Sequence, residues 1–140
     1  MKKGLLAVGL FVSAACLTGC LVIVSEETRG RDGPPVCAPA DETIAEIDAV
    51  SKLSFDSDRK QGYKRIAERT ELRADAQVYL VEAVFEKLSF DNAKEEVLLT
   101  LIGNPSFCRA AEQAILKGLD RLAFENSKKK ILKAISERKI

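Results

Sequence analysis

The chain has 140 residues, of which 46% are hydrophobic and 31% charged, and its formal net charge is +1. This balance is typical of a small globular protein and produces no field that would attract nucleic acid, so we expect no nucleic-acid partner. The chain has no histidine, which excludes His-dependent catalytic triads and the usual His-containing zinc sites.

Residues 1–19 have the pattern of a secretion signal. A basic start is followed by an apolar run over residues 5–15, which is typical of a signal peptide. Residues 17–20, Leu-Thr-Gly-Cys, resemble a bacterial lipobox, in which a peptidase cuts before a cysteine that has received a diacylglycerol. The resemblance implies a mature chain that begins at lipidated Cys20 in the bacterial cell envelope. Two acyl chains on one cysteine are sufficient for stable anchoring.

Two alternatives stay open at this end of the chain. Cys16 also follows small residues, but it lacks the branched apolar residue three positions earlier and is the weaker lipidation site. The apolar run continues through residues 21–24, so an uncleaved membrane helix of about 20 residues is the second alternative. Glycines at positions 4, 9 and 19 disfavour that helix. An aspartate directly after the lipidated cysteine would resemble a signal for retention in the inner membrane. The residue at that position is Leu21, which favours the outer membrane.

Residues 20–40 are expected to form the lipidated cysteine and a flexible tether. The segment is rich in charge, glycine and proline and has no helical period. Cys37 in this segment and Cys108 are the thiols that the mature chain retains besides Cys20. In an oxidising compartment such a pair favours a disulfide. The alternative is two independent cysteines, with Cys108 a small core residue.

Residues 41–140 contain an internal repeat. Phe55, Phe90 and Phe124 lie in similar segments and are separated by 35 and 34 residues. A period of this length is typical of stacked helical hairpins. We therefore predict an all-α domain of about six helices, arranged as three antiparallel hairpins in a short α-solenoid-like stack.

The helices are expected in chain order as follows. The first begins with Asp41 as its N-cap, the third has an apolar stripe over residues 78–88, and the fifth begins with Asn104 as its N-cap and Pro105 as its first helical residue. The second, fourth and sixth follow the three phenylalanines, and their apolar positions superpose when counted from each phenylalanine. This shared register predicts that each hairpin packs in the same way.

Each of the three phenylalanines is predicted to pack in the corner that connects the two helices of its hairpin. The acidic residue that follows, Asp56, Asp91 or Glu125, is expected to cap the second helix of its hairpin. Corners of successive hairpins are too far apart for their carboxylates to share one ion. We therefore prefer capping to a metal site, and we predict no metal and no cofactor.

The corner segments resemble those of a known family. The Ser-Phe-Asp segments at 54–56 and 89–91, the pair Gln77-Val78 and the closing segment at 124–128 are similar to the domain of unknown function 4476. The resemblance covers residues 44–140 and implies the helical fold. Gly62 and Pro105 depart from the family pattern. Because the family has no assigned activity, the resemblance implies no function.

Two further features have an ordinary and a functional interpretation. The last helix is rich in lysine on its outer face. We interpret this face as the solvated surface of a terminal repeat, in preference to a surface that contacts anionic headgroups. Tyr63, Tyr79 and Phe107 could line a ligand groove, but Tyr63 and Phe107 lie near apolar stripes and are expected in the core.

The sequence predicts a lipid-anchored helical module that binds another envelope protein and contacts the membrane through Cys20. The alternative is a protein that binds a small apolar or lipid ligand in a gap between hairpins, which Gly62 could leave open. We expect no enzyme activity, because no hydroxyl or thiol has an evident base to activate it.

Overall fold

The computed structural model describes residues 39–138, and side chains from residue 42 onward. These residues form an all-α domain, as the sequence predicts. Its elements are α1 (Pro39–Ser51), α2 (Asp56–Ala67), α3 (Ala74–Lys87), α4 (Asp91–Gly103), α5 (Arg109–Gly118), the short 3₁₀ turn η1 (Leu119–Arg121) and α6 (Glu125–Glu137).

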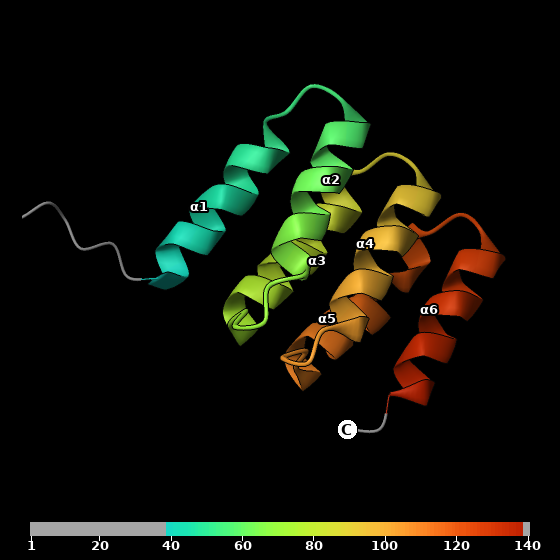
Figure 1. Ribbon diagram of the computed structural model, residues 1–140. Coiled ribbons are helices and arrows are strands. Elements are labelled where there is room, and N and C mark those ends of the chain that lie inside the picture. The colour runs from blue at the N-terminus through green and yellow to red at the C-terminus, as the bar shows by residue number, and fades with distance from the viewer. Residues whose placement is uncertain (1–38, 139–140) are drawn as a thin grey trace, which may run out of the picture. The chain divides into compact units, whose positions relative to one another are not determined.

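The six helices form three hairpins that stack side by side (Figure 1). The odd-numbered helices pack on one another in one layer, α1 on α3 and α3 on α5, and the even-numbered helices pack in a second layer, α2 on α4 and α4 on α6. Because each hairpin contacts mainly its neighbours, the arrangement is that of a short helical repeat. The predicted stack of antiparallel hairpins is therefore confirmed.

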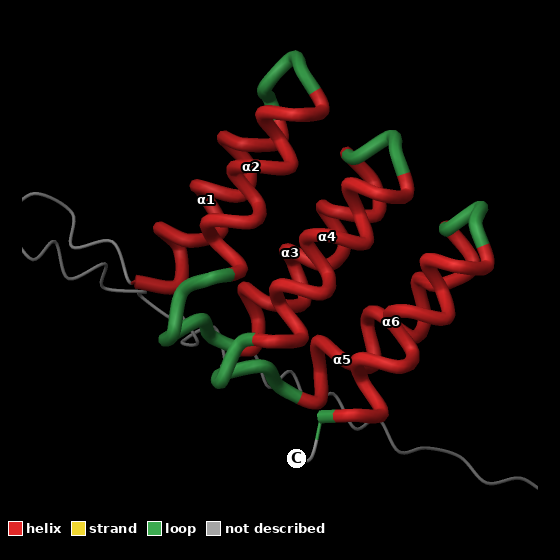
Figure 2. The backbone as a smooth tube through the Cα atoms, turned by 45° about the vertical axis from the view of Figure 1, so that its right-hand side comes forward, coloured by secondary structure: helices red, strands yellow, loops and turns green. Residues whose placement is uncertain are grey.

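The connections alternate between the two ends of the stack (Figure 2). The corners within hairpins, which contain the three phenylalanines, lie together at one end. The connections between hairpins, residues 68–73 and 104–108, lie together at the other end, where α1 also begins. Residue 39, the first residue of α1, therefore lies at the end of the stack opposite to the phenylalanine corners.

The core lies between the two layers and repeats from one hairpin to the next. Counted from each phenylalanine, the seventh residue of the following helix is buried in every hairpin, as the superposed register predicts. The eighth residue is Tyr63, Leu98 or Leu132. The first two are fully buried, but Leu132 is 44% exposed. Within residues 39–138 no further hairpin covers Leu132, which accounts for its exposure.

Gly62 permits close helix packing and leaves no gap for a ligand. It is buried on α2, and a Cβ atom built on it would lie 2.7 Å from Cγ1 of Val50 on α1. A similar approach occurs at Gly118, where a Cβ would lie 2.5 Å from Cε2 of Phe85. The hypothesis of a ligand gap at Gly62 is wrong, because Val50 already fills that space.

Two predicted helix starts are also wrong. The first helix begins at Pro39, so that Asp41 lies within its first turn and not at its N-cap. The fifth begins at Arg109, with Cys108 as its N-cap. Asn104 instead follows the last residue of α4, where its buried side chain has a different role.

Two buried amide side chains hold the connections between hairpins. The Asn104 amide donates to the backbone oxygens of Ala67 and Arg69, both at 2.7 Å, and its oxygen accepts from the backbone nitrogen of Ser106 at 2.9 Å. The Gln77 amide on α3 makes a second set of such bonds. Satisfied buried amides fix backbone that lacks helical hydrogen bonds, so these two residues set the stacking of one hairpin on the next.

Candidate functional site: the face of the odd-numbered helices

The three phenylalanines lie at the hairpin corners, but they do not pack there. Phe55, Phe90 and Phe124 are the N-cap residues of α2, α4 and α6, and 69%, 65% and 67% of their surfaces are exposed. The predicted packing is therefore wrong. In the second and third hairpins the buried corner residue is the leucine two positions earlier, Leu88 or Leu122. The regular spacing of apolar residues identified the corners. It did not identify which residue of each corner is buried.

We accordingly expect Phe90→Ala to leave the stability of the domain almost unchanged. Truncation of a buried phenylalanine costs about 3–5 kcal/mol, whereas exposed substitutions usually stay within about 0.5 kcal/mol. Leu88→Ala, two positions away and in the core, is the matched control and should cost about 2–5 kcal/mol. Urea denaturation followed by circular dichroism measures both. A large loss for Phe90→Ala would contradict the exposed position of its ring.

The carboxylates that follow the phenylalanines bind the next hairpin and do not cap their own helices. Asp56 Oδ1 accepts from the backbone nitrogen of Ser89 at 3.0 Å, and Asp91 Oδ2 accepts from that of Phe124 at 2.8 Å. Asp56, Asp91 and Glu125 accept no hydrogen bond from the backbone amides of their own helices, so the predicted capping by these carboxylates is wrong. In α4 the amide of Ala93 is instead bound by Asn92 Oδ1 at 2.9 Å. Glu125 has no further hairpin to contact and pairs with Lys128.

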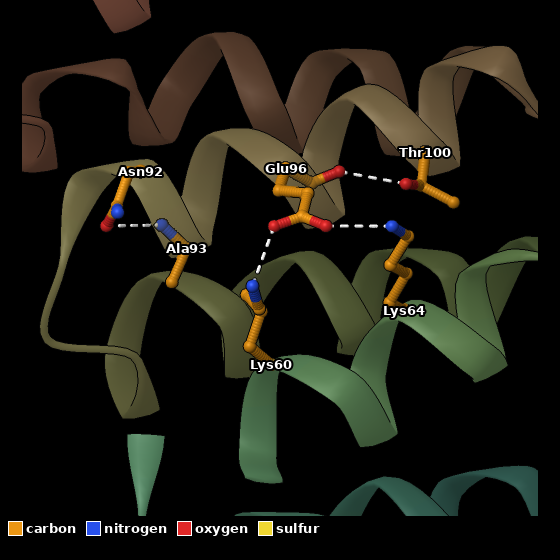
Figure 3. A network of polar contacts seen from close by, with 6 residues as sticks. All are labelled: Lys60, Lys64, Asn92, Ala93, Glu96 and Thr100. Carbon is orange, nitrogen blue, oxygen red and sulfur yellow. Dashed lines mark hydrogen bonds and ion pairs between the residues drawn. The ribbon is translucent and has the colours of Figure 1, made fainter. Parts of the chain in front are cut away.

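On the even-numbered helices the charges pair across hairpins. Glu96 on α4 accepts from Lys60 at 2.8 Å and from Lys64 at 2.7 Å, both on α2 (Figure 3). Hydrogen bonds from these two ammonium groups lower the pKa of Glu96 to about 2. Glu95 likewise accepts from Lys130 and from Ser127 on α6, and these bonds lower its pKa. These charged side chains of the even-numbered helices therefore connect neighbouring hairpins.

The pairing at Glu96 predicts a defined pH dependence. Because the pKa of Glu96 is lower in the folded protein than its ordinary value of 4.5, its contribution to stability is complete above pH 4.5 and disappears as the pH falls towards 2. Glu96→Gln should therefore be less stable than the wild type at neutral pH, and this difference should shrink over that interval. Urea denaturation at several pH values measures it. Glu71→Gln, at an exposed position without an ion pair in residues 42–138, is the control, and an equal pH dependence of its stability difference would contradict the assignment.

The basic outer face predicted for the last helix is largely neutralised by neighbouring carboxylates. Lys128 pairs with Glu125 at 2.7 Å, Lys130 with Glu95 at 2.7 Å, and Lys133 with Glu137 at 3.6 Å. Exposed ion pairs of this kind contribute little to stability. They do reduce the positive charge that α6 presents to a partner, which supports the interpretation as a solvated terminal face.

The odd-helix face, by which we mean the exposed surface of α1, α3 and α5, is the hollowed side of the domain. A hollow of about 390 Å³ lies between α1 and α3, and one of about 410 Å³ lies between α3 and α5. Two more open depressions, of about 540 and 340 Å³, adjoin them. Glu82, near the middle of α3, lines all four hollows. The two main hollows thus meet at one carboxylate.

Glu82 is surrounded by apolar atoms and by other charged groups. The described part of the chain gives it no ion pair or side-chain hydrogen bond. The hollow on one side of it is lined by the apolar Val78, Val81 and Phe85. It is also lined by the charged Lys117, Asp120 and Arg121. On the other side the lining includes Asp48, Ser51, Lys52, Tyr79, Ala83, Glu86 and Lys87. Val81 and Phe85 are buried and Val78 is half-buried, so the apolar part of the hollow is its floor. An unpaired carboxylate above such a floor can bind a cation.

Tyr79 and Asp48 form the edge of the hollow between α1 and α3. The Tyr79 hydroxyl donates to Asp48 Oδ1 at 2.6 Å, and this bond raises the pKa of Tyr79. The predicted groove residue Tyr79 therefore does line a hollow, whereas Tyr63 and Phe107 are buried in the core, as expected. Sequence reasoning missed Glu82. Its only signal is the pair Glu82 and Glu86, four residues apart on one helix, which is common on solvated helices.

The cysteine predictions fall largely outside the described residues. Cys20 and Cys37 both lie there, so the lipidation and the disulfide stay predictions. Cys108 is the half-buried N-cap of α5, and its backbone nitrogen donates to Oε1 of Gln77 at 3.0 Å. Among residues 39–138, no helix combines the length and apolar character needed to cross a membrane. In the same part of the chain no three acidic or thiol side chains are placed to hold one metal ion.

Comparison with known proteins adds no identification. The chain matches no protein-family model, no curated protein and no solved structure. The resemblance to the domain of unknown function 4476 stays a prediction.

Proposed function

We propose that this protein is a lipid-anchored module of the bacterial envelope that binds another envelope protein through its odd-helix face and has no catalytic role. The observation that supports this best is the pair of hollows that meet at the unpaired carboxylate of Glu82. Stacked hairpins offer extended surfaces that suit a helix or an extended peptide. The domain itself resembles the domain of unknown function 4476 at its corners.

The partner should present a basic residue next to an apolar one. Each hollow has space comparable to that filled by a few side chains, about 400 Å³, and both are open at the surface. The half-buried Val78 suits a small aliphatic side chain, and Glu82, which has no ion pair among the described residues although Lys117 and Arg121 line the same hollow, suits a lysine or arginine beside it. The sequences of α1, α3 and α5 together contain eight carboxylates and three basic residues, an acidic excess that favours a cationic segment.

Anchoring would place this face near the membrane. In this proposal Cys20 carries the lipid, residues 1–19 are removed, and the outer membrane is favoured by Leu21. Treated as a coil, the segment 21–38 spans on the order of 25 Å. A partner in the same membrane, or in the layer next to it, is therefore within reach of the odd-helix face.

Crosslinking in intact cells tests this proposal. The protein is crosslinked with its native envelope, purified by a C-terminal tag and analysed by mass spectrometry, with Cys20→Ala as the anchoring control and Glu82→Lys as the surface variant. We expect one protein partner that is lost in both variants. Gln61→Lys, on the exposed part of α2, should retain the partner. Equal recovery from Glu82→Lys and Gln61→Lys would contradict a role for the odd-helix face.

A further inference from the structure

The corners of the three hairpins expose three aromatic rings that the proposed function does not use. A basic residue stands three positions before each phenylalanine: Lys52 before Phe55, Lys87 before Phe90 and Arg121 before Phe124. The three rings are exposed at the same end of the stack. Neighbouring helices in such a stack lie about 8–10 Å apart, so the rings form a spaced row. We call this row, with its three basic residues, the corner edge.

The acidic residues beside the rings are occupied within the domain. Asp56 pairs with Arg59 at 3.4 Å, Asp91 lies 4.0 Å from Lys94, and Glu125 pairs with Lys128 at 2.7 Å. Asp56 and Asp91 also accept backbone hydrogen bonds from the next hairpin, as described above. Each carboxylate that follows a ring is therefore balanced by a cation three residues later.

The remaining charges near the corners are balanced as well. Glu86 pairs with Lys87 at 3.2 Å. Asp58 and Asp120 are exposed, as are Lys52 and Arg121. The corner edge therefore has no strong net field of either sign, and an interaction there would depend mainly on the three exposed rings.

We propose that the corner edge is a second membrane contact, at which the three rings enter the interfacial region of the bilayer that holds the lipid anchor. None of the described hollows is lined by a corner phenylalanine. Separate rings that project from convex corners suit a fluid interface that can close around each of them. Lys52 and Arg121, which are exposed and have no ion pair among residues 42–138, can meet phosphate headgroups near the first and third rings.

The anchor leaves enough chain for this orientation, which rests on the lipidation of Cys20 proposed above. Residue 39 lies at the opposite end of α1 from the first corner, and a helix of 13 residues is about 20 Å long. A chain of the length of residues 21–38 reaches at most about 60 Å when fully extended, which is more than that distance. With the corner edge on the bilayer, the odd-helix face stands roughly upright and stays open to a partner.

Tryptophan fluorescence tests the contact, because the chain contains no tryptophan. The full mature lipoprotein is prepared as three single variants, Phe55→Trp, Phe90→Trp and Phe124→Trp, with Tyr79→Trp on the odd-helix face as control. Each is incorporated into vesicles of phosphatidylethanolamine and phosphatidylglycerol, with and without bromine on the acyl chains. We expect blue-shifted emission and quenching by bromine at all three corner positions, and neither at position 79.

Other results would overturn the contact. Vesicle-bound protein with unquenched tryptophan at all three corners would show that the edge stays in water. A blue shift without bromine quenching, or one that depends on protein concentration in the absence of vesicles, would mean that protein covers the edge. Acylation of Cys20 is measured separately by intact mass, so a failure of anchoring is distinguished from a failure of the corner contact.

Discussion

Gln77→Leu should destabilise the domain by about 3 kcal/mol or more, because it removes three hydrogen bonds at a buried position. Gln77 is 1% exposed. Its amide nitrogen donates to the backbone oxygens of Leu72 at 2.7 Å and of Ser106 at 2.8 Å, and its oxygen accepts from the backbone nitrogen of Cys108 at 3.0 Å. Leucine fills a similar volume but leaves these backbone groups without partners. Urea denaturation measures the change in unfolding free energy.

The control for this prediction is the same substitution on the surface. Gln61→Leu on α2 replaces an exposed glutamine and should change the unfolding free energy by no more than about 0.5 kcal/mol. If the two leucine variants were equally stable, Gln77 would not hold the connections between hairpins. The stacking would then depend on apolar contacts alone.

Asp91→Ala should cost about 3–5 kcal/mol, because it leaves a buried ammonium group without its carboxylate. Asp91 and Lys94 are each 7% exposed. Without Asp91, Lys94 retains only the backbone oxygen of Arg121 at 3.5 Å, and the backbone nitrogen of Phe124 loses its acceptor at 2.8 Å. The loss should appear as a lower midpoint in urea with an unchanged slope.

The third hairpin offers a matched control for Asp91. Glu125 occupies the equivalent position and pairs with Lys128, but its side chain is 71% exposed and no hairpin follows it. Glu125→Ala should therefore cost less than about 1 kcal/mol. Adding Lys94→Met to Asp91→Ala should restore part of the lost stability, since it removes the unpaired buried charge. Equal losses at Asp91 and Glu125 would contradict this account of the contact between hairpins.

The internal repeat predicted the architecture because segments with the same sequence pattern occupy equivalent positions in the three hairpins. The spacing of Phe55, Phe90 and Phe124 placed three corners. The apolar register after each of them identified most buried positions of the even-numbered helices, with Leu132 as an exception. These inferences depend only on helical periodicity, which a single sequence contains. A residue that recurs at the same position of each repeat can point either into the core or into solvent. The repeat therefore did not predict that the three phenylalanine rings are exposed.

The missed features depend on contacts between distant segments. Asn104 was expected to start a helix, since asparagine before proline is a typical N-terminal signal. Its side chain instead reaches backbone oxygens of Ala67 and Arg69, more than thirty residues earlier. The hollows around Glu82 likewise arise where three helices meet. No local pattern distinguishes such a carboxylate from any other exposed glutamate.

Site-specific photocrosslinking tests the central claim most directly. A benzophenone amino acid is placed at Tyr79 on the odd-helix face or at Gln61 on α2, in the full lipoprotein in its own envelope, and the adducts are separated by mass. The account predicts one discrete protein adduct from position 79, its loss when Glu82→Lys is added, and none from position 61. Adducts of equal yield from both positions, or an adduct at 79 that is unaffected by Glu82→Lys, would contradict a binding function for this face.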